Sequence, residues 1–203
     1  MRRFTGHNVH TRQAADTPLK RRTLSIFAPG ILAPSIFVLT FLLGSLGIAS
    51  ATTYRELSLD ELATRAEVGF FGAVSEITVE ARGNEPYTQV TFTVSRPLTG
   101  SPGERVTLDF YGGTLPDGRT VKVEGMPEFV RGDEVIVLAY DAPYYSPIVG
   151  FSQGLWRATP DGFEDLIGRR LSLSDAGRLL RDGEGGERTP ILDALAAKLE
   201  ATP

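Results

Sequence analysis

The stretch YTQVTFTV, residues 87–94, decides the fold class, because polar and apolar side chains alternate along it. Successive side chains of a strand point to opposite faces, so the alternation places Val90, Phe92 and Val94 together on one side. Turn-forming residues bound the stretch, at 84–86 before it and at 99–103 after it. The stretch therefore predicts a β-strand with one face in a hydrophobic core.

Similar short segments lie on both sides of this strand. They span residues 68–79, 106–110, 120–123, 134–140, 148–159 and 163–167, with Gly, Pro and Asp between them. The run at 134–140 is almost continuously apolar, which is typical of a central strand. Several short strands at such spacing favour a mainly β fold, and we expect a small antiparallel β-barrel of the OB type with five or six strands.

A short helix is expected before these strands, and another at the end of the chain. Ser58 and Glu61 have the spacing of a capping box, and Pro190 suits the first turn of the last helix. Between the strands and the last helix the chain is polar and rich in glycine. We therefore predict a β-barrel domain over residues 52–168, a polar linker over 169–188 and a C-terminal helix over 189–203.

The segment before the strands has the three parts of a secretory signal. Six basic residues and one acidic residue open the chain, and no charged residue occurs between Arg22 and Arg55. The apolar core at residues 36–48 is shorter than the roughly 20 residues that a spanning helix needs. Ala49 and Ala51 form an A-x-A site. We therefore expect a signal peptide over residues 1–51, cleavage after Ala51, and a periplasmic or extracellular protein.

Two alternatives concern the same segment. If it is not cleaved, the whole uncharged run is long enough to anchor the protein in the membrane. The pair Arg21 and Arg22 also fits a twin-arginine signal loosely, so the export route stays open.

Loss of this segment would also limit which catalytic and metal-binding side chains remain. Both histidines, His7 and His10, lie within it, and the chain has no cysteine. The residues after Ala51 therefore lack the side chains of a Ser-His-Asp triad, a cysteine nucleophile, a disulfide, or a zinc site of His or Cys. Carboxylates, hydroxyls and a few amines remain, and neither a cofactor nor a metal is expected.

The charge balance points away from nucleic acid. After Ala51 the chain counts 15 Lys and Arg against 24 Asp and Glu, a net charge of −9, and the basic residues form no cluster. Nucleic-acid phosphates are bound by basic surfaces. We therefore expect no nucleic-acid partner, and contact with a membrane only through an uncleaved signal segment.

The order of motifs resembles a known family. The motifs are ELATRAEVGFFGAVSEI at 61–77, YTQVTFTVSRPLTG at 87–100, YGG at 111–113, VEGMPEFVRGDEVIVLAY at 123–140 and VGFSQGLWRA at 149–158. In this order they resemble a widespread family of uncharacterised exported bacterial proteins, in which Lys is usual at the position of Thr99 and Phe at that of Trp156. The resemblance implies an OB-like β-barrel and no particular activity. The opening is also weakly similar to the netrin-like modules of tissue metalloproteinase inhibitors, which are five-stranded OB barrels.

Aromatic residues gather after the central strand. The loop PYYSP at 143–147 precedes Phe151 and Trp156. Tyrosines on a loop bounded by prolines can present rigid contact area to a glycan or a protein. In the alternative, which the need of small barrels for aromatic filling favours, the larger rings fill the barrel and the tyrosines cover its end. The candidate binding residues are Tyr144, Tyr145, Phe151, Gln153 and Trp156. If the Gln153 amide points inward, it must bind backbone groups and is then structural.

Four acids lie close together in the sequence: Glu124, Glu128, Asp133 and Glu134. A pair of carboxylates could hydrolyse a glycosidic bond, and a larger group could bind calcium. Against both readings, acids at the ends of hairpins are normally solvated.

The sequence thus favours a non-catalytic exported binding module whose partner is an exported protein or a component of the cell envelope. A carboxylate-based hydrolase of the envelope, or an inhibitor of an exported metalloprotease, is the alternative. A hydrolase requires two acids that converge in a cleft, with the pKa of one raised by burial.

Overall fold

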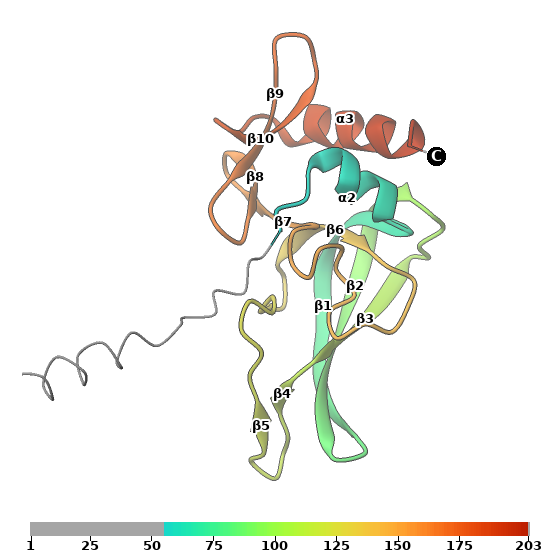
Figure 1. Ribbon diagram of the computed structural model, residues 1–203, viewed down its shortest axis with the longest axis vertical. Helices are drawn as coiled ribbons and strands as arrows, with labels where there is room; N and C mark the ends of the chain where they lie inside the picture. Colours follow the sequence, from blue (N-terminus) through green and yellow to red (C-terminus); the bar gives the residue numbers. More distant parts are fainter. Residues whose placement is uncertain (1–54, 203) are drawn as a thin grey trace, which may run out of the picture. The chain divides into compact units, whose positions relative to one another are not determined.

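An open antiparallel sheet of eight strands is the centre of the structure, a computed structural model that describes residues 55–202. The strands follow the order β10-β9-β8-β7-β6-β1-β2-β3, and β4 and β5 form a separate pair (Figure 1). The elements are α2 (Leu59–Arg65), β1 (Val68–Arg82), β2 (Glu85–Thr99), β3 (Arg105–Tyr111), β4 (Gly113–Thr114), β5 (Thr120–Val121), β6 (Glu134–Ala139), β7 (Leu155–Thr159), β8 (Gly162–Asp165), β9 (Arg170–Leu173), β10 (Leu179–Gly183) and α3 (Arg188–Glu200). The predicted mainly β class is confirmed, whereas the predicted signal peptide lies outside the described residues.

The number and closure of the strands differ from the sequence-based expectation. β3 and β10 are the two edges of the large sheet, and within residues 55–202 no strand pairing joins them. The sheet has eight strands instead of five or six, because β8, β9 and β10 extend it beyond β7. The antiparallel β class is therefore established, and a closed barrel is not.

Residues 169–188, for which the composition predicts a polar linker, instead contain β9 and β10. Leu171 in β9 is fully buried, and β9 pairs with β10 through Leu173 and Leu179. These strands are short and carry few apolar residues, so their own pattern is weak. Hydrogen bonding to a neighbouring strand, which local composition does not report, gives them their conformation.

The strand that opened the sequence analysis forms half of a long hairpin. β1 and β2 have 15 residues each and pair with Val74 opposite Phe92 and Ile77 opposite Val90. Val90 and Phe92 are fully buried, as their alternation predicts. Three register shifts interrupt the β1–β2 pairing, and such bulges bend a strand and increase its twist.

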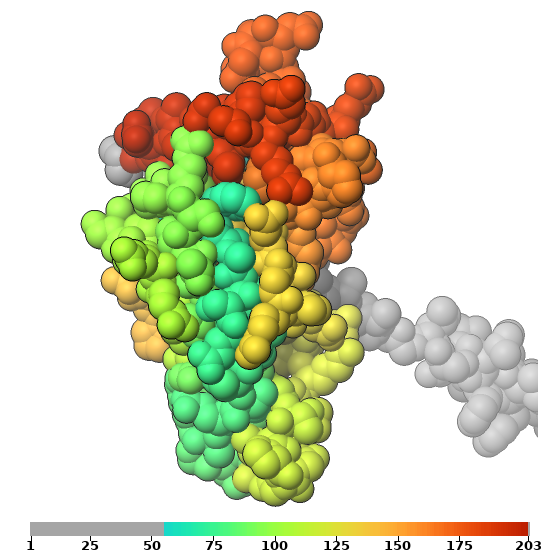
Figure 2. All heavy atoms as spheres, turned by 180° about the vertical axis from the view of Figure 1, so that it is seen from behind, coloured from blue at the N-terminus to red at the C-terminus, as the bar shows by residue number. Residues whose placement is uncertain are grey.

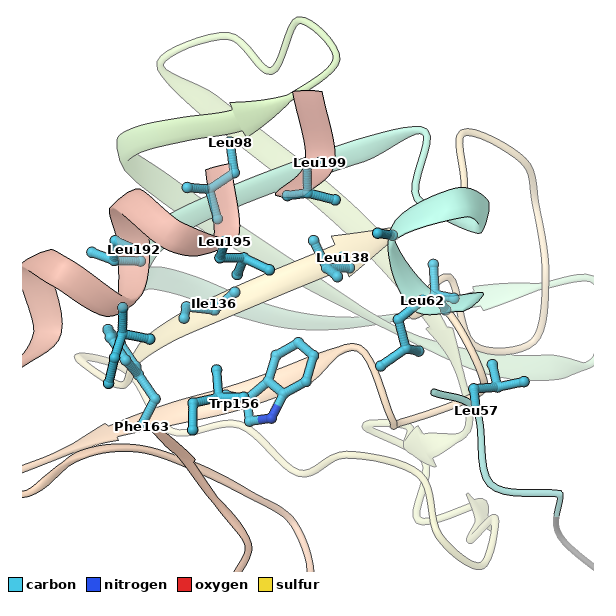
Figure 3. Packing of buried hydrophobic residues seen from close by; sticks show 14 residues of the cluster. Leu57, Leu62, Leu98, Ile136, Leu138, Trp156, Phe163, Leu192, Leu195 and Leu199 are labelled. Carbon is cyan, nitrogen blue, oxygen red and sulfur yellow. The ribbon is translucent and has the colours of Figure 1, made fainter. Parts of the chain in front are cut away.

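β6 separates two hydrophobic cores. On one of its faces Ile136 and Leu138 pack with α2, α3 and Trp156, which Figure 3 shows from close by. On the other face Val135 and Val137 pack with the apolar side of the β1–β2 hairpin, including Phe92. The strand is buried on both faces, which confirms the prediction that residues 134–140 form a central strand. Viewed from behind, β3, β2, β1 and β6 lie side by side, and α3 crosses one end of them (Figure 2).

The two helices cover one face of the sheet. The predicted capping box is present, because Ser58 accepts a hydrogen bond from the Glu61 N–H and Glu61 accepts one from the Ser58 N–H. α3 buries the aliphatic stripe Ile191, Leu192, Leu195 and Leu199. Among residues 55–202 no helix has the length and hydropathy to cross a membrane.

Candidate functional site

All five tyrosines of the described residues gather in one region. The rings of Tyr87 and Tyr111 are 5.4 Å apart between centroids, and those of Tyr111 and Tyr145 are 4.7 Å apart. Tyr140 and Tyr144 form a second pair at 4.8 Å. The region combines two sources: Tyr87 and Tyr111 come from paired positions of β2 and β3, and the other three come from the segment after β6.

A groove of about 690 Å³ lies among these rings. We call it the tyrosine groove. Its lining consists of Arg82, Tyr87, residues 107–109, residues 140–145 and Pro147. The loop after β6 forms one wall and the middle of β3, residues 107–109, forms the other, and the two segments lie side by side in Figure 1. A cleft of this size with aromatic walls and a few polar groups is typical of a binding site.

Backbone hydrogen bonds fix the loop that carries the exposed tyrosines. The Tyr140 N–H donates to the Pro147 carbonyl at 2.9 Å, and the Tyr111 N–H of β3 donates to the Tyr145 carbonyl at 2.8 Å. The side chains of Tyr144 and Tyr145 nevertheless remain 55% and 64% exposed. A loop with a fixed backbone presents its rings at a low cost in conformational entropy, which favours contact with a ligand.

Two charged side chains, Arg82 and Asp109, also line the tyrosine groove. Arg82 lies over the ring of Tyr87, at 4.8 Å from its centroid, and donates to Oδ2 of Asp109 at 2.5 Å. The hydrogen bond to Asp109 raises the pKa of Arg82 above its ordinary value. The second oxygen of Asp109, Oδ1, is buried and has no hydrogen-bond partner among the described residues. Burial, followed by the negative charge of Glu85, raises the pKa of Tyr111.

The structure places the predicted site residues at different locations. Tyr144 and Tyr145 line the tyrosine groove. Trp156 is fully buried in the core beneath the helices, as the packing alternative predicts. Phe151 is half-buried in a turn with φ of 70°. Tyr144 and Tyr145 are exposed and belong to neither hydrophobic core.

Gln153 has the structural role that was expected of an inward amide. It accepts a hydrogen bond from the Leu57 N–H at 2.8 Å and donates one to the Arg55 carbonyl at 2.9 Å. It therefore holds the segment before α2 against the turn after β6. Its side chain is buried and does not line the tyrosine groove.

Sequence reasoning missed Tyr87, Tyr140 and Asp109, which line the groove, and Tyr111, whose ring packs against Tyr87 and Tyr145 beside it. Tyr87 begins the clearest strand and Tyr111 precedes two glycines, so both were visible as strand residues. Their proximity depends on the register that places Tyr87 opposite Tyr111, which the sequence alone does not show.

The four neighbouring acids do not converge. Asp133 accepts from Arg157 at 3.1 Å and from the Val130 N–H at 3.0 Å. Glu134 pairs with Arg188 at 2.9 Å. Glu128 and Glu124 are exposed, with Lys122 at 3.9 Å from Glu128. No group of three or more His, Cys, Asp or Glu side chains suitable for a metal ion occurs within residues 55–202.

The fold and the site together define a mainly β protein with a groove lined by tyrosines. No protein-family model, curated protein or solved structure matches the chain.

Proposed function

We propose that this protein is a non-catalytic binding module that recognises an exported protein or a component of the cell envelope through the tyrosine groove. One observation carries the proposal: a loop with a fixed backbone exposes Tyr144 and Tyr145 beside the tyrosine groove, where Asp109 has a buried carboxylate oxygen without a partner among residues 55–202. Tyrosines in such positions dominate the energetics of many interfaces. Neither ring is required for the packing of the two hydrophobic cores.

The proposal includes export. The basic start, the short apolar core and the A-x-A site at residues 49–51 support removal of a signal peptide and action in the periplasm or outside the cell. An uncleaved segment that anchors the protein to the membrane is the alternative.

We also propose that the β1–β3 part of the sheet, together with β6 and β7, is OB-like, within the family of exported bacterial proteins that the motif order resembles. The bulges of β1 and the core enclosed between β6 and the β1–β2 hairpin support this proposal, because both accompany strong sheet curvature.

The test compares two double variants, each immobilised as bait for envelope and secreted proteins of the organism that produces this protein. Tyr144→Ala with Tyr145→Ala removes the exposed rings, and we expect about tenfold or greater loss of the specifically retained partner. Val130→Ala with Ile167→Ala is the matched control, because these side chains are 66% and 74% exposed and lie outside the groove. Thermal unfolding verifies that both variants fold. Equal retention by the tyrosine variant and the wild type would refute the proposal.

A further inference from the structure

β3 is an edge strand, and its hydrogen-bonding direction can be derived. Along an antiparallel strand, alternate residues direct both N–H and C=O toward the same neighbour. The Gly112 N–H donates to the Pro86 carbonyl at 2.9 Å, and the Glu104 carbonyl accepts from the Val94 N–H at 2.8 Å. The even positions of β3 therefore bond to β2. Arg105, Thr107, Asp109 and Tyr111 direct their backbone groups toward the open edge.

Only one end of this edge is occupied within the described residues. The outward N–H of Tyr111 donates to the Tyr145 carbonyl, so the loop at residues 140–147 occupies that end of the β3 edge. The outward backbone groups of Thr107 and Asp109 have no backbone partner within residues 55–202. Both residues line the tyrosine groove. One wall of the groove is thus a free strand edge, with donors and acceptors that repeat at roughly 7 Å, twice the strand rise.

The two sides of this edge differ in chemistry. Leu108 and Phe110 lie on the side that packs against the core, where Phe110 is buried. Thr107 and Asp109 lie on the opposite side, where the Asp109 carboxylate pairs with Arg82 through Oδ2. Asp141, another acid, also lines the groove, whereas Arg82 is its only basic residue. Because Asp109 is paired with Arg82, the acid of the groove without a salt bridge among residues 55–202 is Asp141, on the loop that faces β3. The groove therefore combines the apolar side of β3 with an acid on its opposite wall.

We propose that the tyrosine groove binds an extended peptide segment of the partner, which adds to the free edge of β3 as a further strand and carries alternating apolar and basic side chains. This inference rests on the proposed function and specifies its ligand. Main-chain hydrogen bonds to Thr107 and Asp109 supply affinity, and alternate side chains supply specificity. The basic residues suit Asp141, which lines the groove, and the net charge of −9 after Ala51.

A glycan would use the tyrosine rings without the strand edge. Natural proteins usually protect an edge strand with proline, lysine, a bulge or a covering segment. β3 has neither proline nor lysine, and its pairing with β2 is regular. The exposed edge therefore favours an extended peptide over a glycan as the ligand.

The experiment begins with a library of random 12-residue peptides displayed on phage and selected on the protein produced from the full-length chain. The selected peptide is synthesised with a fluorophore, and its Kd is measured by anisotropy. Peptides with one N-methylated amide at each position follow. We expect alternate N-methyl groups to weaken binding about five- to tenfold, because strand addition uses every second amide.

Two variants test the edge from the protein side. Thr107→Pro removes the outward N–H at an edge position that tolerates proline, and should raise Kd about five- to tenfold. Thr107→Val is the matched control, because it removes only the hydroxyl that contacts Thr91 and should leave Kd unchanged. Hydrogen exchange at the Thr107 and Asp109 amides should slow when the peptide binds. If Thr107→Pro does not fold, the N-methylated peptides and the hydrogen-exchange rates of the wild-type protein still test strand addition.

The outcomes separate this inference from the proposed function. Binding that depends on Tyr144 and Tyr145, yet shows no alternation of N-methyl effects and no protection of the edge amides, would overturn strand addition and leave the tyrosine site standing. Failure to select any peptide that protects the β3 edge would also overturn it. Retention of an envelope polysaccharide that depends on the tyrosines alone would likewise overturn strand addition.

Discussion

Asp165 is the buried carboxylate on which three segments of the chain converge. Its side chain is 3% exposed, and it accepts hydrogen bonds from Arg169 at 2.9 Å and from Arg181 at 3.3 Å. Arg181 also donates to the Leu57 carbonyl at 2.8 Å, and Arg169 also pairs with Glu56. This network therefore ties the segment before α2 to β8, to the turn before β9 and to β10.

The environment of Asp165 favours its ionised form. Burial acts to raise the pKa, but hydrogen bonds from Arg169 and from the Ile167 N–H, together with the charge of Arg169, outweigh burial and hold the pKa of Asp165 below its ordinary value. A carboxyl whose pKa is lower in the folded state stabilises the protein above its unfolded pKa, near 4, and this contribution is lost as the pH falls through the folded pKa.

Asp165→Asn should therefore lower the free energy of unfolding by about 2 kcal/mol at pH 7, with a deficit that shrinks below about pH 4. Urea unfolding at several pH values measures both effects. Asp175→Asn, at an exposed turn between β9 and β10, is the matched control and should change little. A deficit that stays constant from pH 7 to pH 3 would contradict this account of the network.

Two single residues illustrate how far sequence reasoning extends at this scale. Gln153 was singled out from the sequence, and the condition attached to it is met, because its amide is inward and binds backbone groups. Tyr87 was not identified as a site residue, since its ring partner Tyr111 is remote along the chain and only the β2–β3 register brings them together.

At the scale of elements, α3 is part of the packed fold. Its buried stripe joins the core of β6, α2 and Trp156, and Arg96 of β2 pairs with Asp193 at 2.7 Å. The helix itself was predicted from the sequence, with Pro190 in its first turn. Its partner surface was not, because the segment before the helix was expected to be a linker and instead forms two strands.

Leu195→Ala in α3 should lower the free energy of unfolding by about 2–4 kcal/mol, because Leu195 is 1% exposed and its loss leaves a cavity against the sheet. The midpoint of urea unfolding, followed by circular dichroism, provides the measurement. Glu200→Ala, at an exposed position of the same helix, serves as the reference and should have a minor effect. A negligible loss in Leu195→Ala would mean that α3 does not stabilise the sheet.

At the scale of the whole molecule, the proposed removal of residues 1–51 would determine which residues belong to the working protein. We expect the exported product to begin at Thr52, and the intact mass and N-terminal sequence of the secreted protein measure this directly. Ala51→Glu should block processing, because a small side chain is needed at the cleavage site. Ser50→Glu is the matched control at the permissive middle position of the A-x-A site. A mature protein that retains Met1 would contradict cleavage after Ala51 and favour the membrane-anchored alternative.

The sequence by itself determined the local features of this protein. Alternating side chains identified β2 and its buried face, a nearly continuous apolar run identified β6 as a central strand, and the capping residues located the start of α2. These features depend on neighbours within a few positions, whose effect on the backbone is readable from side-chain chemistry.

The tertiary structure alone decided the pairing order, the open sheet, the strands β9 and β10 and the tyrosine groove. Each depends on contacts between distant segments: Tyr111 meets Tyr145, and Arg181 meets Asp165. A strand of weak local preference forms when a neighbour satisfies its backbone, and a groove exists only where two remote walls face each other. Long-range pairing therefore built the site from residues that local patterns leave separate.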